Sequence, residues 1–139
     1  MKVKVTQKAD FHFIGSGGEY AGPLLIDAAA HVGGKGRGFR PPELLMYSIA
    51  GCMGIHTYEA LHKAGKHVGE IEVETDGERQ ETHPRVYTKI SLTFRMKGEA
   101  LTQQDVRNAI EEALHKTCSI AAMVNRVAPI SYEFTIVNR

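Results

Sequence analysis

An apolar run in the middle of the chain, residues 44–55, constrains the fold more than any other segment. Pro41 and Pro42 precede it and are followed by Glu43. This is a typical helix start, because proline fits the first turn and a carboxylate there faces the positive end of the helix dipole. We expect the helix to cover residues 42–65. Since its first half is apolar nearly all round, we expect it to be buried and to need more cover than one sheet gives.

Alternating patterns predict strands on both sides of this helix. Val3 and Val5, and then residues 11–14 and 23–27, predict a strand-rich opening, with a turn at residues 15–18. Residues 70–75 and 86–96 predict two long antiparallel strands that reverse at residues 82–84. The alternation of residues 130–136 predicts a closing strand.

Two shorter helices are expected before the closing strand. Thr102 and Asp105 predict a helix start that resembles a capping box, and a second short helix is expected to begin at Cys118. The order of strands, long helix, two long strands, two helices and strand predicts the α+β class, with a mostly antiparallel sheet packed on helices. Residues 1–139 are expected to form a single domain, because the length is ordinary for one domain and no linker or repeat divides the chain.

Composition and charge argue against several classes of partner. The net charge is +1, with acidic and basic residues interspersed, so we expect neither nucleic acid nor a membrane surface as a partner. The chain opens without an apolar signal region, and its longest apolar run is too short to span a bilayer, so we expect a cytoplasmic protein. A homodimer is the expected cover for the far side of the long helix, where Gly51 and Gly54 permit the close approach of another backbone.

The chain has two cysteines, Cys52 and Cys118, in different sequence settings. Cys52 lies in the apolar run, where burial raises a thiol pKa, whereas Cys118 lies at an expected helix N-terminus, which favours a thiolate. In the cytoplasm, paired cysteines are more typical of a transient redox role than of a structural disulfide. The two settings fit a reactive thiol and the partner that closes a disulfide on it. An inert Cys52 stays open as an alternative, because free cysteine is often buried.

No cofactor or metal is expected. Cys52 and His56 stand four residues apart on one helix face, but two ligands are too few for a zinc site. The glycine-rich loop at residues 33–38 lacks the spacing of a phosphate-binding loop, so we interpret it as a flexible connection.

Three segments carry a family resemblance over nearly the whole chain. They are Pro42-Glu43-Leu44 leading to Gly51-Cys52, His83-Pro84-Arg85 with Thr88-Lys89-Ile90, and Cys118-Ser119-Ile120-Ala121 before the final strand. In this order they resemble the OsmC/Ohr family, most closely its YhfA-like branch. The resemblance implies an intertwined homodimer, in which sheets wrap two central helices and active sites lie at the subunit interface. It also implies a cysteine peroxidase that acts on organic hydroperoxides in oxidative stress defence.

The resemblance assigns roles by position. It implies that Cys52 is the peroxidatic cysteine, that Cys118 is the resolving cysteine and that Glu43 is the glutamate near the start of the central helix. The Cys52 thiolate would attack the terminal peroxide oxygen and give an alcohol and a sulfenic acid, with which Cys118 would condense to a disulfide. A dithiol reductant, for example a lipoylated protein, would then reduce this disulfide.

The chain departs from the family pattern in two places. The family's peroxidases pair the reactive cysteine and the glutamate with an arginine in the N-terminal strands, yet the first arginine here is Arg37. Arg40 is the candidate substitute if its loop folds over the helix start; a merely solvated arginine is the alternative. Glu43 lies nine residues ahead of Cys52, where those peroxidases have ten, which turns it by about 100° on the helix. The helix dipole alone also explains a carboxylate at Glu43.

Three functions therefore fit the sequence. The first is a peroxidase for organic hydroperoxides, and the second is a thiol enzyme or redox sensor that meets another electrophile. The third is a dimeric binding protein whose apolar interface pocket holds a small molecule. Only the first requires a peroxide-driven disulfide between Cys52 and Cys118.

Overall fold

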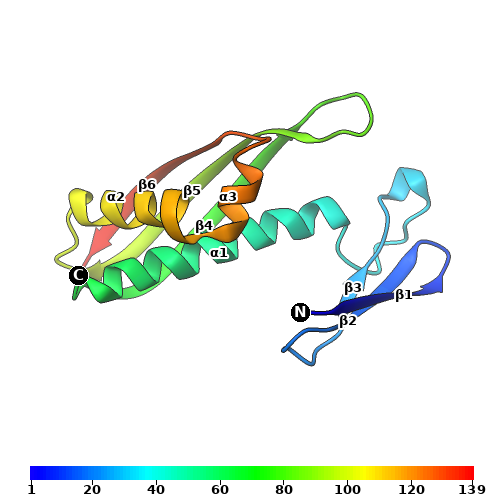
Figure 1. Ribbon diagram of the computed structural model, residues 1–139, viewed down its shortest axis with the longest axis horizontal. Helices are drawn as coiled ribbons and strands as arrows, with labels where there is room; N and C mark the ends of the chain where they lie inside the picture. The colour runs from blue at the N-terminus through cyan, green and yellow to red at the C-terminus, as the bar shows by residue number, and fades with distance from the viewer. The chain divides into compact units, whose positions relative to one another are not determined.

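The computed structural model describes residues 1–139, which divide into two compact units, Met1–Leu45 and Met46–Arg139 (Figure 1). Helices and strands are both well represented, so the α+β class is confirmed. The elements in order are β1 (Val3–Ala9), β2 (His12–Gly17), β3 (Leu24–Ile26), η1 (Ala30–Val32), α1 (Pro41–Lys63), β4 (His67–Arg79), β5 (Tyr87–Glu99), α2 (Gln103–Glu112), η2 (Ala113–Thr117), α3 (Ser119–Val124) and β6 (Ile130–Asn138).

The first unit contains an antiparallel sheet of three strands in the order β1-β2-β3. Strand β2 continues through Gly17, so the turn expected at residues 15–18 begins later than predicted. Gly17 and Gly18 make this turn with φ values of 104° and 74°, a region that glycine enters without steric cost. Only Gly15 and Asp27 are buried in this unit. Its sheet therefore has no buried apolar side chain.

The second unit contains the sheet β4-β5-β6. Strands β4 and β5 are antiparallel and reverse in the loop at residues 80–86, as the sequence predicts. Strand β6 instead pairs parallel to β5, with Ile90 opposite Ile130 and Met96 opposite Ile136. The parallel pairing follows from the connection, because α2, η2 and α3 form a crossover between the two strands. The sheet is thus only partly antiparallel.

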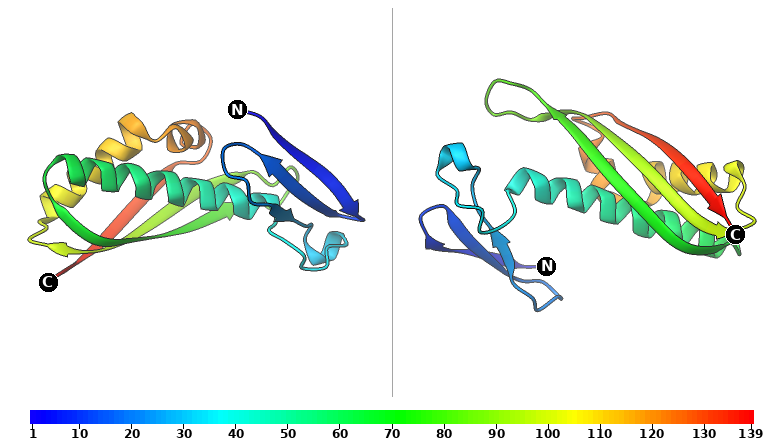
Figure 2. Two further views of the ribbon diagram at one scale, coloured as in Figure 1. Left: turned by 90° about the horizontal axis from the view of Figure 1, so that it is seen from below. Right: turned by 180° about the vertical axis from the view of Figure 1, so that it is seen from behind.

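Helices cover one face of this second sheet (Figure 2). The inward side chains of β5, which include Phe94, are at most 1% exposed and pack against buried residues of α1 and α2. Helix α2 begins with the predicted capping box: Asp105 N donates to Thr102 Oγ1 at 3.1 Å, and Thr102 N donates to Asp105 Oδ2 at 3.0 Å. A cap of this kind stabilises the helix by about 1 kcal/mol.

Helix α1 is buried along one stripe only within this chain. The stripe consists of Ile49, Met53, Thr57 and Leu61. On another side, Tyr47, Ile55 and Tyr58 are 62%, 68% and 49% exposed. We expected the helix to be buried on all sides, but its own chain covers only one of them. Neither α1 nor any other helix combines the length and apolar character needed to cross a bilayer.

Candidate functional site

The fold brings the two cysteines of the second unit together. Cys52 lies on α1, is half-buried and packs against the core. Cys118 caps the N-terminus of α3, is 2% exposed and forms a hydrogen bond with the thiol of Cys52. Both cysteines are free thiols. Two residues 66 positions apart in the sequence thus form one dithiol site.

The environment of Cys118 keeps its thiol protonated. Burial raises the pKa of Cys118, and the hydrogen bond with Cys52 raises it further. Backbone hydrogen bonds act in the opposite direction, among them the bond from Ala121 N to Cys118 Sγ at 3.3 Å. The prediction that the helix N-terminus favours a thiolate at Cys118 is therefore wrong, because the loss of solvation outweighs the helix terminus. Cys118 suits the partner thiol, and Cys52 is left as the candidate nucleophile.

A local irregularity of the backbone orients Cys118. Helix α2 does not continue as an α-helix but widens into the π-helical turn η2, after which Cys118 N donates to Ala113 O at 2.9 Å. Wide turns of this kind are rare and are often found at functional sites. The sequence shows the start of α3 but gives no signal for this turn.

The two charged candidates of the first unit also meet. Arg40 Nε donates to Glu43 Oε1, and the side chains are 51% and 42% exposed. The Arg40 carbonyl accepts from Glu43 N and Leu44 N, so Arg40 stands directly at the start of α1. Arg40 is therefore ion-paired rather than merely solvated, and its substitution for the family arginine stays a prediction.

The course of α1 separates Glu43 from Cys52. An ideal helix places positions nine residues apart about 180° apart around its axis and about 14 Å apart along it. Helix α1 by itself therefore does not bring Glu43 to Cys52. The site residues form two pairs, Arg40 with Glu43 and Cys52 with Cys118.

A buried carboxylate, which the sequence analysis missed, fastens the loop before α1. Asp27 is 1% exposed and accepts hydrogen bonds from Ala28 N at 2.8 Å, from Lys35 N and Arg37 N at 3.1 Å, and from Arg37 Nε at 2.9 Å. The Arg37 guanidinium holds the pKa of Asp27 well below its usual range, with help from these backbone donors. We call this arrangement the Asp27 clasp. The glycine-rich loop is thus anchored at two points.

A second group that the sequence pattern did not reveal begins on α1 one helical turn after Cys52. His56 Nδ1 lies 3.2 Å from Glu59 Oε2, and Lys63 Nζ lies 2.9 Å from Glu59 Oε1. Hydrogen bonds from Lys63 and then from His56 lower the pKa of Glu59. From the sequence, His56 was a candidate only for a metal ligand beside Cys52. The sequence signal for this group was its helical spacing, because Glu59 follows His56 by three residues and Lys63 follows Glu59 by four.

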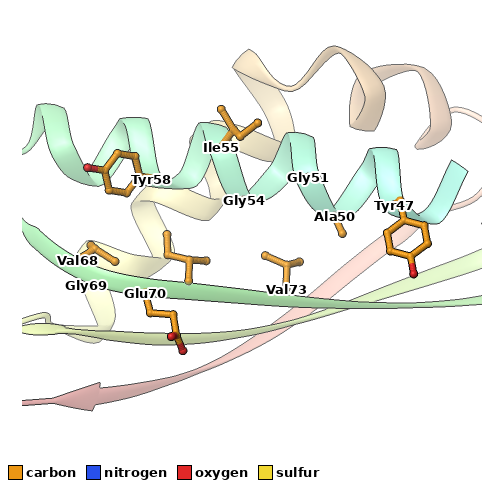
Figure 3. A pocket seen from close by; sticks show the side chains of 11 residues that line it. Tyr47, Ala50, Gly51, Gly54, Ile55, Tyr58, Val68, Gly69, Glu70 and Val73 are labelled. Atoms are coloured by element: carbon orange, nitrogen blue, oxygen red, sulfur yellow. The ribbon is translucent and has the colours of Figure 1, made fainter. Parts of the chain in front are cut away.

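An open apolar groove runs between α1 and β4 (Figure 3). Its volume is about 540 Å³, and its lining includes Tyr47, Ile55 and Tyr58 of α1 and Val73 of β4. A side-chain carbon added at Gly51 would meet no atom within 4 Å, so Gly51 leaves room for another backbone. Gly54 instead faces Val73 of the same chain, 3.4 Å from the position of an added carbon.

Comparison with known proteins identifies the family. Residues 34–133 match the family model of OsmC-like protein. This chain belongs to the OsmC family. The OsmC-like chain is also 31% identical to Protein YhfA of Escherichia coli (strain K12) over 97 residues, 70% of this chain and 72% of YhfA. The predicted YhfA-like branch is thereby confirmed.

Solved structures share the fold of this OsmC-like protein. A hypothetical protein from Aquifex aeolicus VF5 is 25% identical, with a TM-score of 0.82 over 98% of this chain and 96% of the other. An organic hydroperoxide resistance protein OsmC from Legionella pneumophila is 14% identical, with a TM-score of 0.69 over 96% and 95% of the two chains. At 14% identity, the similarity to the Legionella pneumophila protein is evidence for a shared fold alone.

Proposed function

We propose that this OsmC-like protein is a thiol peroxidase that reduces organic hydroperoxides through a disulfide between Cys52 and Cys118. The hydrogen bond between the two thiols carries the proposal, because a sulfenic acid formed on Cys52 has a second thiol already in contact. The substrate class is supported by the Legionella pneumophila protein of the same fold, which is named an organic hydroperoxide resistance protein.

The proposed cycle has three steps. The Cys52 thiolate attacks the terminal oxygen of the hydroperoxide, so that the O–O bond breaks, the alkoxide leaves and takes up a proton, and Cys52 becomes a sulfenic acid. The Cys118 thiol then attacks the Cys52 sulfur, forms the disulfide and releases water. A dithiol such as a lipoylated protein takes up the disulfide's oxidising equivalents and regenerates both thiols.

We propose further that the protein works as a homodimer in the cytoplasm, each chain forming a single OsmC-like domain. The exposed apolar side chains on α1 and the groove beside them support a second copy as the cover, because soluble monomers rarely expose large contiguous apolar patches. The first unit supports the same conclusion, because a small sheet without a buried apolar face is not stable by itself. Arg40 and Glu43 are proposed to complete the active site at the subunit interface.

The dimer is tested by placing a charge in the groove. Ile55→Asp puts a carboxylate on a side chain that is 68% exposed in the single chain and would be covered in the dimer. We expect sedimentation velocity to show loss of the dimer. Val127→Asp is the matched control, since Val127 is 69% exposed and lies outside the groove. A wild-type protein that sediments as a monomer at every concentration would refute the proposal.

The peroxidase is tested by mass spectrometry of the reduced protein after brief exposure to cumene hydroperoxide. We expect the wild type to lose two hydrogen atoms, and to do so faster than with hydrogen peroxide. Cys118→Ser is expected to stop at a sulfenic acid on Cys52, and Cys52→Ser is expected not to react. An unchanged mass in the wild type rules the peroxidase out and leaves the alternatives of a thiol sensor for another electrophile or a small-molecule-binding dimer.

A further inference from the structure

We propose that His56 is the proton acceptor for the Cys52 thiol and that Glu59 is the residue that positions His56. The inference rests on the proposed function, in which Cys52 is the nucleophile. It assigns a catalytic role to a histidine that neither the family resemblance nor the comparisons single out.

The geometry of α1 places the three side chains in a row. His56 follows Cys52 by four residues, a spacing at which side-chain carbons of one helix face lie about 5 to 6 Å apart. Side chains in helices generally lean toward the N-terminus, which is the side of His56 on which Cys52 lies. His56 is 29% exposed, which holds it partly out of solvent beside the half-buried thiol.

Glu59 supplies the orienting group that a catalytic imidazole needs. Its Oε2 lies 3.2 Å from His56 Nδ1, which leaves Nε2 as the nitrogen available for another proton. Lys63 holds the other carboxylate oxygen, and the lowered pKa of Glu59 keeps this group charged at neutral pH. A nucleophile, a base and a carboxylate in sequence form the arrangement by which enzymes activate weak nucleophiles.

The elements packed against this side of α1 add few other groups that could accept the proton of Cys52. Cys118 faces Cys52 and is itself the thiol that retains its proton. On η2, His115 is 57% exposed and is bound to Glu111 at 3.0 Å, and Lys116 is exposed. Glu112 at the end of α2 interacts with Lys63 and thereby adds negative charge at the far end of the row. His56 is thus the imidazole on the same helix face as Cys52.

The proton transfers balance over the first step of the cycle. His56 takes the proton of the Cys52 thiol and becomes an imidazolium, whose charge Glu59 offsets. The thiolate then attacks the terminal peroxide oxygen, and the leaving alkoxide takes the proton back from His56. The net products are the alcohol and the Cys52 sulfenic acid, with His56 neutral again. A positioned acid and base of this kind accelerates such a step by about 10²-fold to 10⁴-fold.

The test measures the reactivity of Cys52 without a peroxide. In a Cys118→Ser background, the rate of alkylation by iodoacetamide is followed from about pH 5 to about pH 10, so that the rate reports the thiolate fraction of Cys52. We expect His56→Gln to lower the rate at pH 7 about tenfold and to leave the rate at pH 10 unchanged, where the thiol ionises without a base. Glu59→Gln should act in the same direction with a smaller loss. His56→Asn serves as the second variant if His56→Gln does not fold.

His62→Gln is the matched control, because His62 lies on the same helix about 15 Å from Cys52 along the axis. Coinciding pH profiles for the His56 variant and its background would overturn the inference. The readout is independent of turnover: alkylation that depends on His56 in a protein that hydroperoxides do not oxidise supports the base and refutes the peroxidase.

Discussion

The two units of the chain differ in the interactions that stabilise each of them internally. Every buried hydrophobic residue of the protein belongs to the second unit, from Ile49 to Ala128. In the first unit the buried residues are Gly15 and Asp27, and the clasp around Asp27 consists of a salt bridge and backbone hydrogen bonds. The interior of the second unit is therefore formed by packed apolar side chains, whereas the one buried side chain of the first unit is a carboxylate.

This difference gives the two units opposite responses to pH. The pKa of Asp27 is lowered in the folded protein, so its contribution to stability is present above the ordinary carboxyl range and is lost as the pH falls. The pKa of Cys118 is raised, so its contribution is present below the ordinary thiol range and is lost as the pH rises. Acid should loosen the first unit and alkali the second. Substitutions that change side-chain volume or charge should therefore affect the stability of the two units differently.

The largest effect is expected from a cavity in the second unit. Phe94 is fully buried between the sheet and the helices, and Phe94→Ala should lower the free energy of unfolding by about 3 to 5 kcal/mol. Urea denaturation followed by circular dichroism measures the change. Ser131→Ala, an exposed position on β6, is the control and should stay within about 0.5 kcal/mol. A small loss at Phe94 would mean that the second unit does not depend on its apolar core.

The next effect is the alkaline loss of stability through Cys118. Above about pH 8.5 the unfolded chain releases the thiol proton while folded Cys118 keeps it, so the free energy of unfolding should fall by about 1.4 kcal/mol per pH unit. Urea denaturation of reduced wild type and Cys118→Ala at several pH values gives this slope as a difference. Tyr132, whose pKa burial also raises, is present in both proteins and cancels. Parallel curves for the two proteins would contradict a buried, protonated Cys118.

The sequence predicted the elements whose signals are local. The start of α1 at Pro41, the capping box of Thr102 and Asp105, the reversal between β4 and β5, and the helix that begins after Cys118 all agree with the structure. Each of these depends on residues within a few positions of one another. The family resemblance, carried by short segments around the cysteines, is likewise confirmed.

The sequence could not predict what depends on distant neighbours. The thiol of Cys118 is governed by burial and by Cys52, neither of which its flanking residues reveal. The parallel pairing of β6 is decided by the crossover and not by the strand's own alternation. Asp27 and Arg37, ten residues apart, carry no pattern that marks them as partners. The roles of Cys52, Cys118, Glu43 and Arg40 stay proposals.

In the first unit the expected effect is local. Asp27→Asn removes the charge that Arg37 and the backbone amides of Lys35 and Arg37 face. We expect hydrogen–deuterium exchange at these two amides to become faster, while amides of the β5 core keep their rates. Acidification of the wild type below the ordinary carboxyl range should reproduce part of this change. Faster exchange in both units alike would show that the clasp stabilises the whole chain.

The smallest effect is expected from a neighbouring ion pair that lies on the surface. Lys35 Nζ lies 3.3 Å from Asp10 Oδ2, with side chains that are 65% and 59% exposed. Exposed pairs contribute about 0 to 1 kcal/mol, and the contact of Lys35 with Asp27 uses its backbone amide. Lys35→Ala should therefore leave the exchange of the Arg37 amide unchanged, in contrast to Arg37→Ala. If both variants accelerate exchange equally, charge anywhere on the loop stabilises the first unit, and burial of Asp27 is not the deciding feature.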